Sequence, residues 1–337
     1  MNPTIETGLK SLVESTTTAM VRPRYEGCNI GTWIGFKHNN FLVEEAVLEH
    51  FRSAGLSSRR LYEEFGLGLD LVSIDTRIQT SLHLDDLVTA TVVPTTRDGD
   101  DRFGFKVTLT VDRDGTPTKA ISSKVAVQLR IDDVFPGAEA PAPLAPYSVH
   151  RIGGADTAPV TTPARAGRLD DGDRGRGDSG ADDPVMAQLL AGRNAVGWKW
   201  RIPYFYVHFT RRMQMNGYLR HMEEVVDRFL AERGISIRTM LDQRAWIPAA
   251  THSKIELVEE AHMEEDLYTV YAVEDIFKDL LYRSRMETYV VRDGVPVLTS
   301  QGEITHGYAV IEGRDDWRLV SFDDAVQQAF RGTPVTP

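Results

Sequence analysis

The segment Arg113-Asp114-Gly115-Thr116-Pro117 returns as Arg292-Asp293-Gly294-Val295-Pro296, 179 residues further along the chain. The acidic pair Glu44-Glu45 returns as Glu223-Glu224 at the same offset. Five more identities share it: Val47 and Val226, Gly55 and Gly234, Ser57 and Ser236, Arg59 and Arg238, and His83 and His262. Matches at one separation predict a tandem duplication of a unit of roughly 110–130 residues, a period too long for a solenoid array. Two such copies in one chain indicate the fused form of a symmetric dimer.

The two repeats are separated by a segment of different composition. Residues 136–184 hold few large apolar side chains and many Gly, Pro and charged residues, as in Pro136–Pro143 and Arg168–Asp178. Such a segment has little to bury against the entropy of ordering its backbone. We expect the first repeat in residues 1–135, a flexible linker in 136–184 and the second repeat in 185–337.

Composition and charge exclude several classes of protein. A net charge of −11 argues against general affinity for nucleic acid or anionic membranes. No apolar run approaches the ~20 residues needed to cross a bilayer, and Met1–Lys10 does not resemble a secretory signal. The single cysteine, Cys28, excludes an internal disulfide and a cysteine-built metal site, and we interpret it as a packing residue. These features predict a cytoplasmic protein without nucleic-acid or membrane partners.

Each repeat contains one helix of about four turns followed by strands. Tyr218, Met222, Val225, Val226 and Phe229 recur at helical spacing in the second repeat. Glycines at the ends of the two expected helices, Gly55 and Gly234, are typical of helix C-caps. Runs rich in β-branched and aromatic residues predict strands over residues 88–93, 103–111, 120–131, 267–273, 282–291 and 297–311. The repeated Arg-Asp-Gly predicts a hairpin turn, so each repeat reads as an α+β layer with its helix on one sheet face.

The second repeat resembles a known family around its helix. Met215-Asn216-Gly217-Tyr218-Leu219-Arg220-His221-Met222-Glu223-Glu224 is similar to the Asn…Tyr-Leu…Glu-Glu stretch that opens the central helix of hotdog thioesterases of the 4-hydroxybenzoyl-CoA type. His38–Glu45 is a looser version, and His83–Leu87 and His262–Leu267 stand where the family has a Gly-Asp turn. The resemblance implies a double hotdog fold, in which each repeat wraps an antiparallel β-sheet around one long central helix. It covers both repeats and leaves out the linker.

The resemblance also implies acyl-thioester substrates, carried on coenzyme A or on an acyl carrier protein. Hydrolysis needs a polarised carbonyl, and free N–H groups at a helix N-terminus can supply this. We therefore expect the starts of the two helices to bind substrate through Asn39, Asn40, Gly217 and Tyr218. Asn216 is a catalytic candidate there, and its alternative role is that of a helix cap.

Helix geometry separates the paired acids. At 100° per residue, Glu223 and its counterpart Glu44 lie nearer the apolar stripe than Glu224 and Glu45. We predict that Glu223 and Glu44 face a cleft as general base or nucleophile, and that Glu224 and Glu45 are surface charges. The alternative for Glu223 is an exposed helix acid.

Two histidines complete the catalytic candidates. His252 is expected at the start of a strand, where the first repeat has Ser73, and a residue type kept in one copy suggests one retained site. Many family members carry an acid just before the helix; here Gly31 or His208 falls at that place. The alternative for both histidines is a packed or exposed side chain. The sequence contains no His-Glu-x-x-His, Gly-rich phosphate loop or Gly-x-Ser-x-Gly, so we expect neither a metal nor a cofactor.

Three functions remain open at the level of sequence. The first is a thioesterase that releases a carboxylic acid. The second is a dehydratase or hydratase of acyl thioesters, and the third is a non-catalytic acyl-binding protein. Each is compatible with a monomer that resembles a dimer internally, or with a homodimer of double hotdogs.

Overall fold

The computed structural model describes residues 4–135, 137–153, 177, 182–207, 209, 211–314 and 317–332. The first half contains α1 (Ile5–Glu14), β1 (Thr17–Val21), η1 (Tyr25–Gly27), α2 (Phe36–Ser53), α3 (Ser58–Phe65), β2 (Leu67–Ile78), β3 (Val88–Pro94), β4 (Phe103–Arg113), β5 (Thr116–Ile131), η2 (Ala145–Tyr147) and β6 (Ser148–Val149). The second contains α4 (Pro184–Leu190), β7 (Ala195–Arg201), η4 (Tyr204–Tyr206), α5 (Met215–Glu232), α6 (Ile237–Arg244), β8 (Trp246–Leu257), β9 (Asp266–Phe277), β10 (Leu281–Arg292), β11 (Val295–Ile311), β12 (Trp317–Val320) and α7 (Asp324–Phe330).

The two halves share one order of elements at one offset. The helix pairs α2/α5 and α3/α6 and the strand pair β2/β8 begin and end 179 residues apart. Isolated bridges follow the same offset, because Trp33 pairs with His83 and Arg212 with His262. The amide of each histidine donates to an acid three residues later, Asp86 or Glu265, over 2.7 Å. Both histidines therefore have a structural place in a turn.

One antiparallel sheet runs through both halves in the order β1-β3-β4-β5-β2-β8-β11-β10-β9-β7. The halves meet where β2 pairs with β8, from Ser73 opposite Glu256 to Arg77 opposite His252. At the middle of this pairing Asp75 lies opposite Lys254, which is its own counterpart at the 179-residue offset. The two strands are therefore related by a local two-fold axis through this pair.

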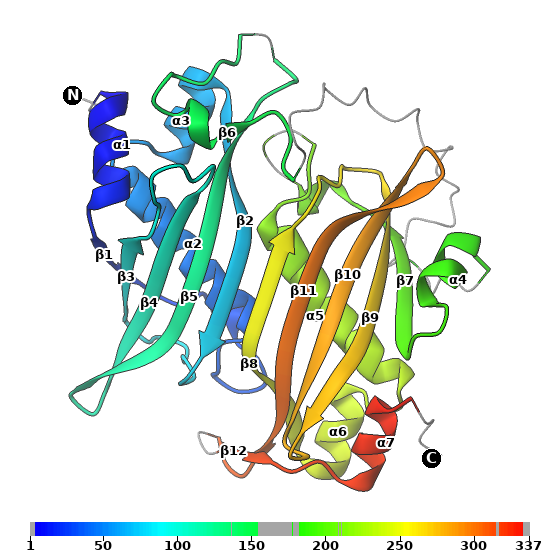
Figure 1. Cartoon of the computed structure of the whole chain (residues 1–337). Coiled ribbons are helices and arrows are strands. Elements are labelled where there is room, and N and C mark those ends of the chain that lie inside the picture. Colours follow the sequence, from blue (N-terminus) through cyan, green and yellow to red (C-terminus); the bar gives the residue numbers. More distant parts are fainter. Residues whose placement is uncertain are drawn as a thin grey trace.

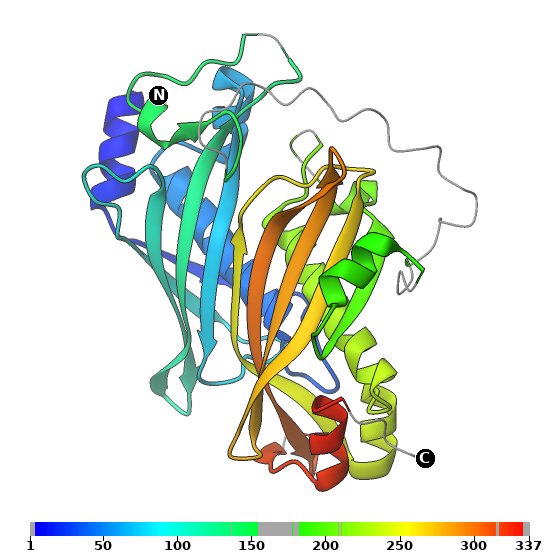
Figure 2. The ribbon, with the colours of Figure 1, turned by 45° about the vertical axis from the view of Figure 1, so that its right-hand side comes forward.

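The helices α2 and α5 are both 18 residues long and lie on the same face of the sheet (Figure 1). Figure 2 shows α5 behind the strands of the second half, with α6 and α7 beyond its lower end. The expected stripe of α5 is buried, and Tyr218, Met222 and Phe229 are at most 1% exposed. Each fully buried side chain of this size contributes about 1.5–3 kcal/mol of transfer free energy. The helix prediction for the second half is thus confirmed.

The expected turn glycines adopt the conformation that favours glycine. Gly55 and Gly234 follow the ends of α2 and α5 with φ of 72° and 76°. In the β4–β5 hairpin Asp114 and Gly115 have φ of 53° and 78°, so both central residues are left-handed, as a tight hairpin requires. The repeated Arg-Asp-Gly is therefore a hairpin turn in the first half.

One residue lies differently from the sequence expectation. His252 is inside β8, not at its start, because the strand begins at Trp246. Of the expected linker 136–184, the structure describes residues 137–153, 177 and 182–184. In the first of these stretches Leu144 and Ile152 are buried, and β6 pairs in parallel with the end of β5. The domain limits stay a prediction.

Candidate functional site

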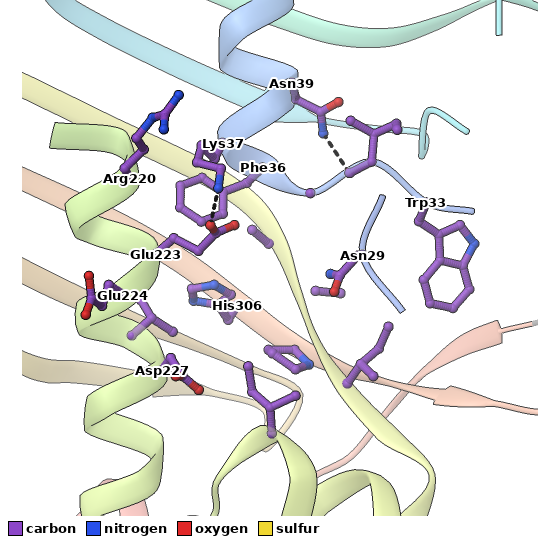
Figure 3. A pocket seen from close by; sticks show the side chains of 18 of the residues that line it. Asn29, Trp33, Phe36, Lys37, Asn39, Arg220, Glu223, Glu224, Asp227 and His306 are labelled. Carbon is purple, nitrogen blue, oxygen red and sulfur yellow. Dashed lines mark hydrogen bonds and ion pairs between the residues drawn. The ribbon is translucent and has the colours of Figure 1, made fainter. Parts of the chain in front are cut away.

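A cleft of about 1410 Å³ opens between the two halves. Its walls come from the loop before α2 and the first turn of α2 in one half, and from α5, α6 and β8 in the other (Figure 3). The volume exceeds the ~300–1,000 Å³ of common small-molecule pockets, so it can hold an extended ligand. The polar side chains that line it include Asn29, Lys37, Asn39, Arg220, Glu223, Glu224, Asp227 and His306.

The amino end of α2 supplies hydrogen-bond donors at this cleft. Gly35 is the N-cap, and the first intrahelical bond runs from the Asn39 amide to the Gly35 carbonyl over 3.1 Å. The amides of Phe36, Lys37 and His38 precede that bond and have no intrahelical acceptor. Together with the positive end of the helix dipole they favour a negative charge in front of the helix. Because Gly35, Phe36 and Lys37 line the cleft, such a charge would lie inside it.

Glu223 reaches this helix end from the other half. Its Oε2 lies 2.5 Å from the Nζ of Lys37, and the two side chains are 44% and 17% exposed. In Figure 3 the carboxylate of Glu223 points from α5 toward the first turn of α2. The structure thus brings one predicted catalytic residue to a helix start, although to the start of the helix in the other repeat.

The neighbouring acids differ between the two helices. Glu224 lines the same cleft with a side chain 29% exposed, 3.5 Å from Arg228. The sequence does not predict this place on the cleft wall, and the assignment of Glu224 as a surface charge stays a prediction. Glu45, its counterpart on α2, is 50% exposed and pairs with Arg52. The helical periodicity cannot distinguish these two cases, because a cleft wall and open solvent demand the same polar face.

Asn39 also lines the cleft and is 1% exposed. Its Nδ2 donates to the carbonyl of Ile34 over 3.3 Å, while Oδ1 has no hydrogen-bond partner in the structure. The side chain therefore ties the loop before α2 to the helix and leaves one buried acceptor unused.

Three other predicted binding residues do not line this cleft. Asn40 is fully buried, donates to Ser253 Oγ over 3.1 Å and accepts from Thr76 Oγ1 over 2.6 Å. Gly217 permits close packing, since a Cβ there would lie 2.6 Å from the carbonyl oxygen of Tyr206. Tyr218 is in the core, where burial raises the pKa of its hydroxyl. These residues hold the helices in place.

Asn216 and Glu44 belong to the other helix start. Asn216 is the second residue of α5 and half-buried, and Glu44 corresponds on α2 to Glu223 on α5. Burial, with a smaller effect of Glu45, raises the pKa of Glu44 to about 7, and Arg220 opposes this shift. Neither residue lines the cleft described above.

Of the two predicted histidines, His252 does not line the cleft. His252 Nε2 lies 2.8 Å from Asp75 Oδ1, so this side chain links β8 to β2 at the junction of the halves. His208 lies outside the described residues.

A histidine that the sequence analysis did not select lines the cleft. His306 on β11 is 3% exposed, and burial lowers its pKa to about 3, so the ring is neutral. It stacks on Tyr282 with ring centroids 5.4 Å apart and meets the edge of Phe36. The first half has Val127 at the corresponding position. His252 was selected because only one repeat has a histidine at that position. The same criterion would have selected His306.

The start of α5 is occupied by buried ion pairs. Arg212 Nη2 lies 2.5 Å from Asp70 Oδ2, with side chains 5% and 2% exposed. Arg130 Nε lies 2.9 Å from Glu260 Oε1, with side chains 7% and 3% exposed. Each pair joins a residue of the first half to one of the second.

In the described part of the chain, no three or more His, Cys, Asp or Glu side chains gather as a metal site would require. In the same residues no helix has both the length and the apolar character to cross a bilayer.

Comparison with known proteins places the fold. No protein-family model matches the chain, and no curated protein matches it by sequence. Among solved structures, the 12:0-ACP thioesterase from Umbellularia californica is 10% identical, covers 90% of this chain and 94% of its own, and gives a TM-score of 0.54. An acyl-ACP thioesterase from Bacteroides thetaiotaomicron is 11% identical, covers 86% of this chain and 97% of its own, and gives a TM-score of 0.50.

A candidate oleoyl thioesterase from Lactobacillus plantarum is similar over a comparable length. It is 11% identical, covers 87% of this chain and 95% of its own, and gives a TM-score of 0.54. At such identities the likeness concerns the fold, and the predicted α+β tandem hotdog is confirmed. Any inference about function must therefore come from the residues of the cleft.

Proposed function

We propose that this protein hydrolyses an acyl thioester, carried on coenzyme A or an acyl carrier protein, in the cleft between its halves. The observation that carries the proposal is the meeting of Glu223 with the amino end of α2 in one cavity. A carboxylate and a set of free amides are the two elements that acyl transfer from a thioester needs. The thioesterases named above give further support, since they share the fold.

The chemistry follows from this placement. Glu223 takes a proton from water while the water oxygen attacks the carbonyl carbon, and the carbonyl electron pair moves onto oxygen. The free amides of Phe36, Lys37 and His38 are the donors available to that oxyanion. When the carbonyl re-forms, the C–S bond breaks with its electrons on sulfur, and the Glu223 carboxyl returns the proton to the thiolate. The products are a carboxylic acid and a thiol.

Glu223 also fits the role of nucleophile. Its carboxylate would then attack the carbonyl carbon and expel the thiolate, forming a mixed anhydride that water hydrolyses in a second step. A single turnover in water enriched in ¹⁸O tests for this route. Label in Glu223 identifies the anhydride with water attacking the glutamyl carbon, whereas label in the product alone arises from direct attack or from attack of water on the acyl carbon of the anhydride.

A substrate panel tests the proposed function. Acyl-CoA and acyl-carrier-protein substrates of varied chain length and ring content are incubated with the protein, and free thiol is followed with a chromogenic disulfide. We expect thiol release that depends on Glu223 and persists when the exposed Glu45 becomes Gln. Absence of thiol release over the whole panel would reject hydrolysis.

The dehydratase or hydratase is the second candidate. Its support is His306, because a histidine and a carboxylate, Glu223, line one cleft. Gain or loss of enoyl absorbance without thiol release would favour it. Binding of the thioesters without either signal would favour the acyl-binding protein.

A further inference from the structure

A second apolar cluster lies apart from the main core and against the cleft. Trp33, Ile247 and Ala309 are buried together, and Leu241, Ala249 and Trp317 pack on them. All six line the cleft, and they come from the loop before α2, from α6, β8, β11 and β12. We refer to these six residues as the apolar chamber.

The two tryptophans form one wall of the apolar chamber. Their rings meet edge to face, with centroids 5.1 Å apart and planes at 65°. Trp33 is 8% exposed and lies two residues before Gly35, the N-cap of α2. Trp317 begins β12, which pairs with the end of β11 through Ile311 opposite Trp317. The wall thus joins a loop of the first half to a C-terminal strand of the second.

β12 and β6 occupy corresponding places in the two halves but run in opposite directions. β6 pairs in parallel with Leu129 and Arg130 of β5. At the 179-residue offset their counterparts are Tyr308 and Ala309, which pair antiparallel with β12. The two halves therefore cover the same strand end with different segments, and Trp317 belongs to the segment of the second half.

We propose that the apolar chamber holds the acyl chain of the substrate and that the Trp33–Trp317 pair limits the length of that chain. The inference rests on the thioester site proposed above, because the chamber begins beside the helix end that would polarise the carbonyl. Its residues carry no charged group, so an apolar chain gains about fourfold in affinity for each methylene buried there. The polar carrier would instead leave hydrogen-bonding groups unpaired in it.

Binding of saturated linear carboxylic acids, from four to eighteen carbons, tests this assignment without requiring turnover. Dissociation constants are measured by calorimetry for the full-length protein. In the wild type we expect affinity to rise about fourfold per carbon and then level off where the chamber is full. In Trp317→Ala the plateau moves to chains at least two carbons longer. Arg318→Ala serves as the matched control, since Arg318 follows Trp317, is 64% exposed and pairs with Glu312.

Ala249→Leu tests the part of the chamber that β8 supplies, and it gives a result even if Trp317→Ala fails to fold. Ala249 is only half-buried and faces the cleft, so a larger side chain there shortens the chamber. We expect the plateau to move to chains at least one carbon shorter. An unchanged plateau in folded Trp317→Ala, or in Ala249→Leu, would overturn the assignment.

The acid titrations test the apolar chamber, and the thioester panel tests hydrolysis. Each proposal can therefore be rejected without the other. Hydrolysis together with an unmoved plateau rejects the chamber and keeps the thioesterase. A plateau that moves as expected, without hydrolysis of any thioester, keeps the chamber and rejects the thioesterase. Absence of acid binding in the wild type rejects the chamber.

Discussion

The amino ends of α2 and α5 are counterparts, yet one borders a cleft and the other is filled by charge. Around the start of α5 four buried charged residues form two ion pairs: Asp70, Arg130, Arg212 and Glu260. At the 179-residue offset their counterparts around the start of α2 are Ala249, Ala309, Trp33 and Ser81. All four counterparts line the cleft. The positions that hold four buried charged side chains around the start of α5 thus hold Trp33, Ser81, Ala249 and Ala309 around the start of α2, where they line the cleft.

The two helix starts also differ in how they connect the halves of the protein. The filled end joins the halves through pairs that are almost completely excluded from solvent, where removal of one partner leaves a charge unpaired. The open end joins them through Lys37 and Glu223, and the Glu223 side chain remains 44% exposed. One end is suited to hold the halves together, and the proposed thioester site lies at the other.

The largest effect is expected at the filled end. Arg212→Met leaves Asp70 buried without its cation and should lower the free energy of unfolding by about 3–5 kcal/mol. Lys37→Met removes the cation of the partly exposed Lys37–Glu223 pair at the open end and should cost less than about 1 kcal/mol. Urea denaturation of both variants measures the difference. Equal losses would show that the two ends do not differ in cohesion.

The next effect concerns catalysis. Glu223→Gln should reduce kcat/KM for a thioester at least ~100-fold, because it removes the base or nucleophile from the transition state. Glu44→Gln, the same change at the counterpart position, should alter it less than about threefold. Steady-state thiol release with one substrate compares the two. A similar loss in both variants would assign a second working site to the start of α5.

A smaller effect is expected in the pH dependence of stability. The pKa of Glu44 is raised from 4.5 to about 7, so folding favours its neutral form. The resulting stabilisation is complete below pH 4.5 and is lost as pH rises through 7. Between pH 4.5 and 8 the wild type should lose about 1–3 kcal/mol relative to Glu44→Gln. Urea midpoints across this range measure it, and parallel curves for the two proteins would contradict the assignment.

The smallest effect is expected where the halves meet. His252→Ser installs the residue that the first half carries at the corresponding position, Ser73. The bond between His252 and Asp75 is partly exposed, so its loss should cost less than about 1 kcal/mol. Turnover should change less than about threefold. A tenfold loss of turnover in a His252→Ser variant of normal stability would instead indicate that His252 takes part in catalysis.

Identity between the repeats predicts the fold, and difference between them predicts the site. Gly55, Gly234 and the paired Arg-Asp-Gly segments recur because both halves need the same helix ends and hairpins. The cleft depends instead on positions that changed, such as Trp33 against Arg212 and Ala249 against Asp70. A position-by-position comparison of the two repeats would have marked these differences, although not their meaning.

The sequence does not show which residues that are distant along the chain come into contact. Glu223 could be selected from helical periodicity alone, but Lys37 lies 186 residues away and carries no pattern of its own. Asp70 and Arg212, 142 residues apart, become partners only when the two halves pack together. His306 could have been selected from the sequence, because the other repeat has no histidine at the corresponding position. Its burial, however, depends on the folded sheet.

The charges at the centre of the β2–β8 pairing influence which molecule each half recognises. Within one chain the two-fold axis sets Asp75 opposite Lys254, and opposite charges across antiparallel strands attract. If the first half paired with the first half of another molecule in the same register, Asp75 would face a second Asp75 and repel it. The second half would set Lys254 against Lys254. The charges at the junction therefore disfavour pairing of β2 with β2, or of β8 with β8, between two molecules. They favour pairing of β2 with β8 within one chain.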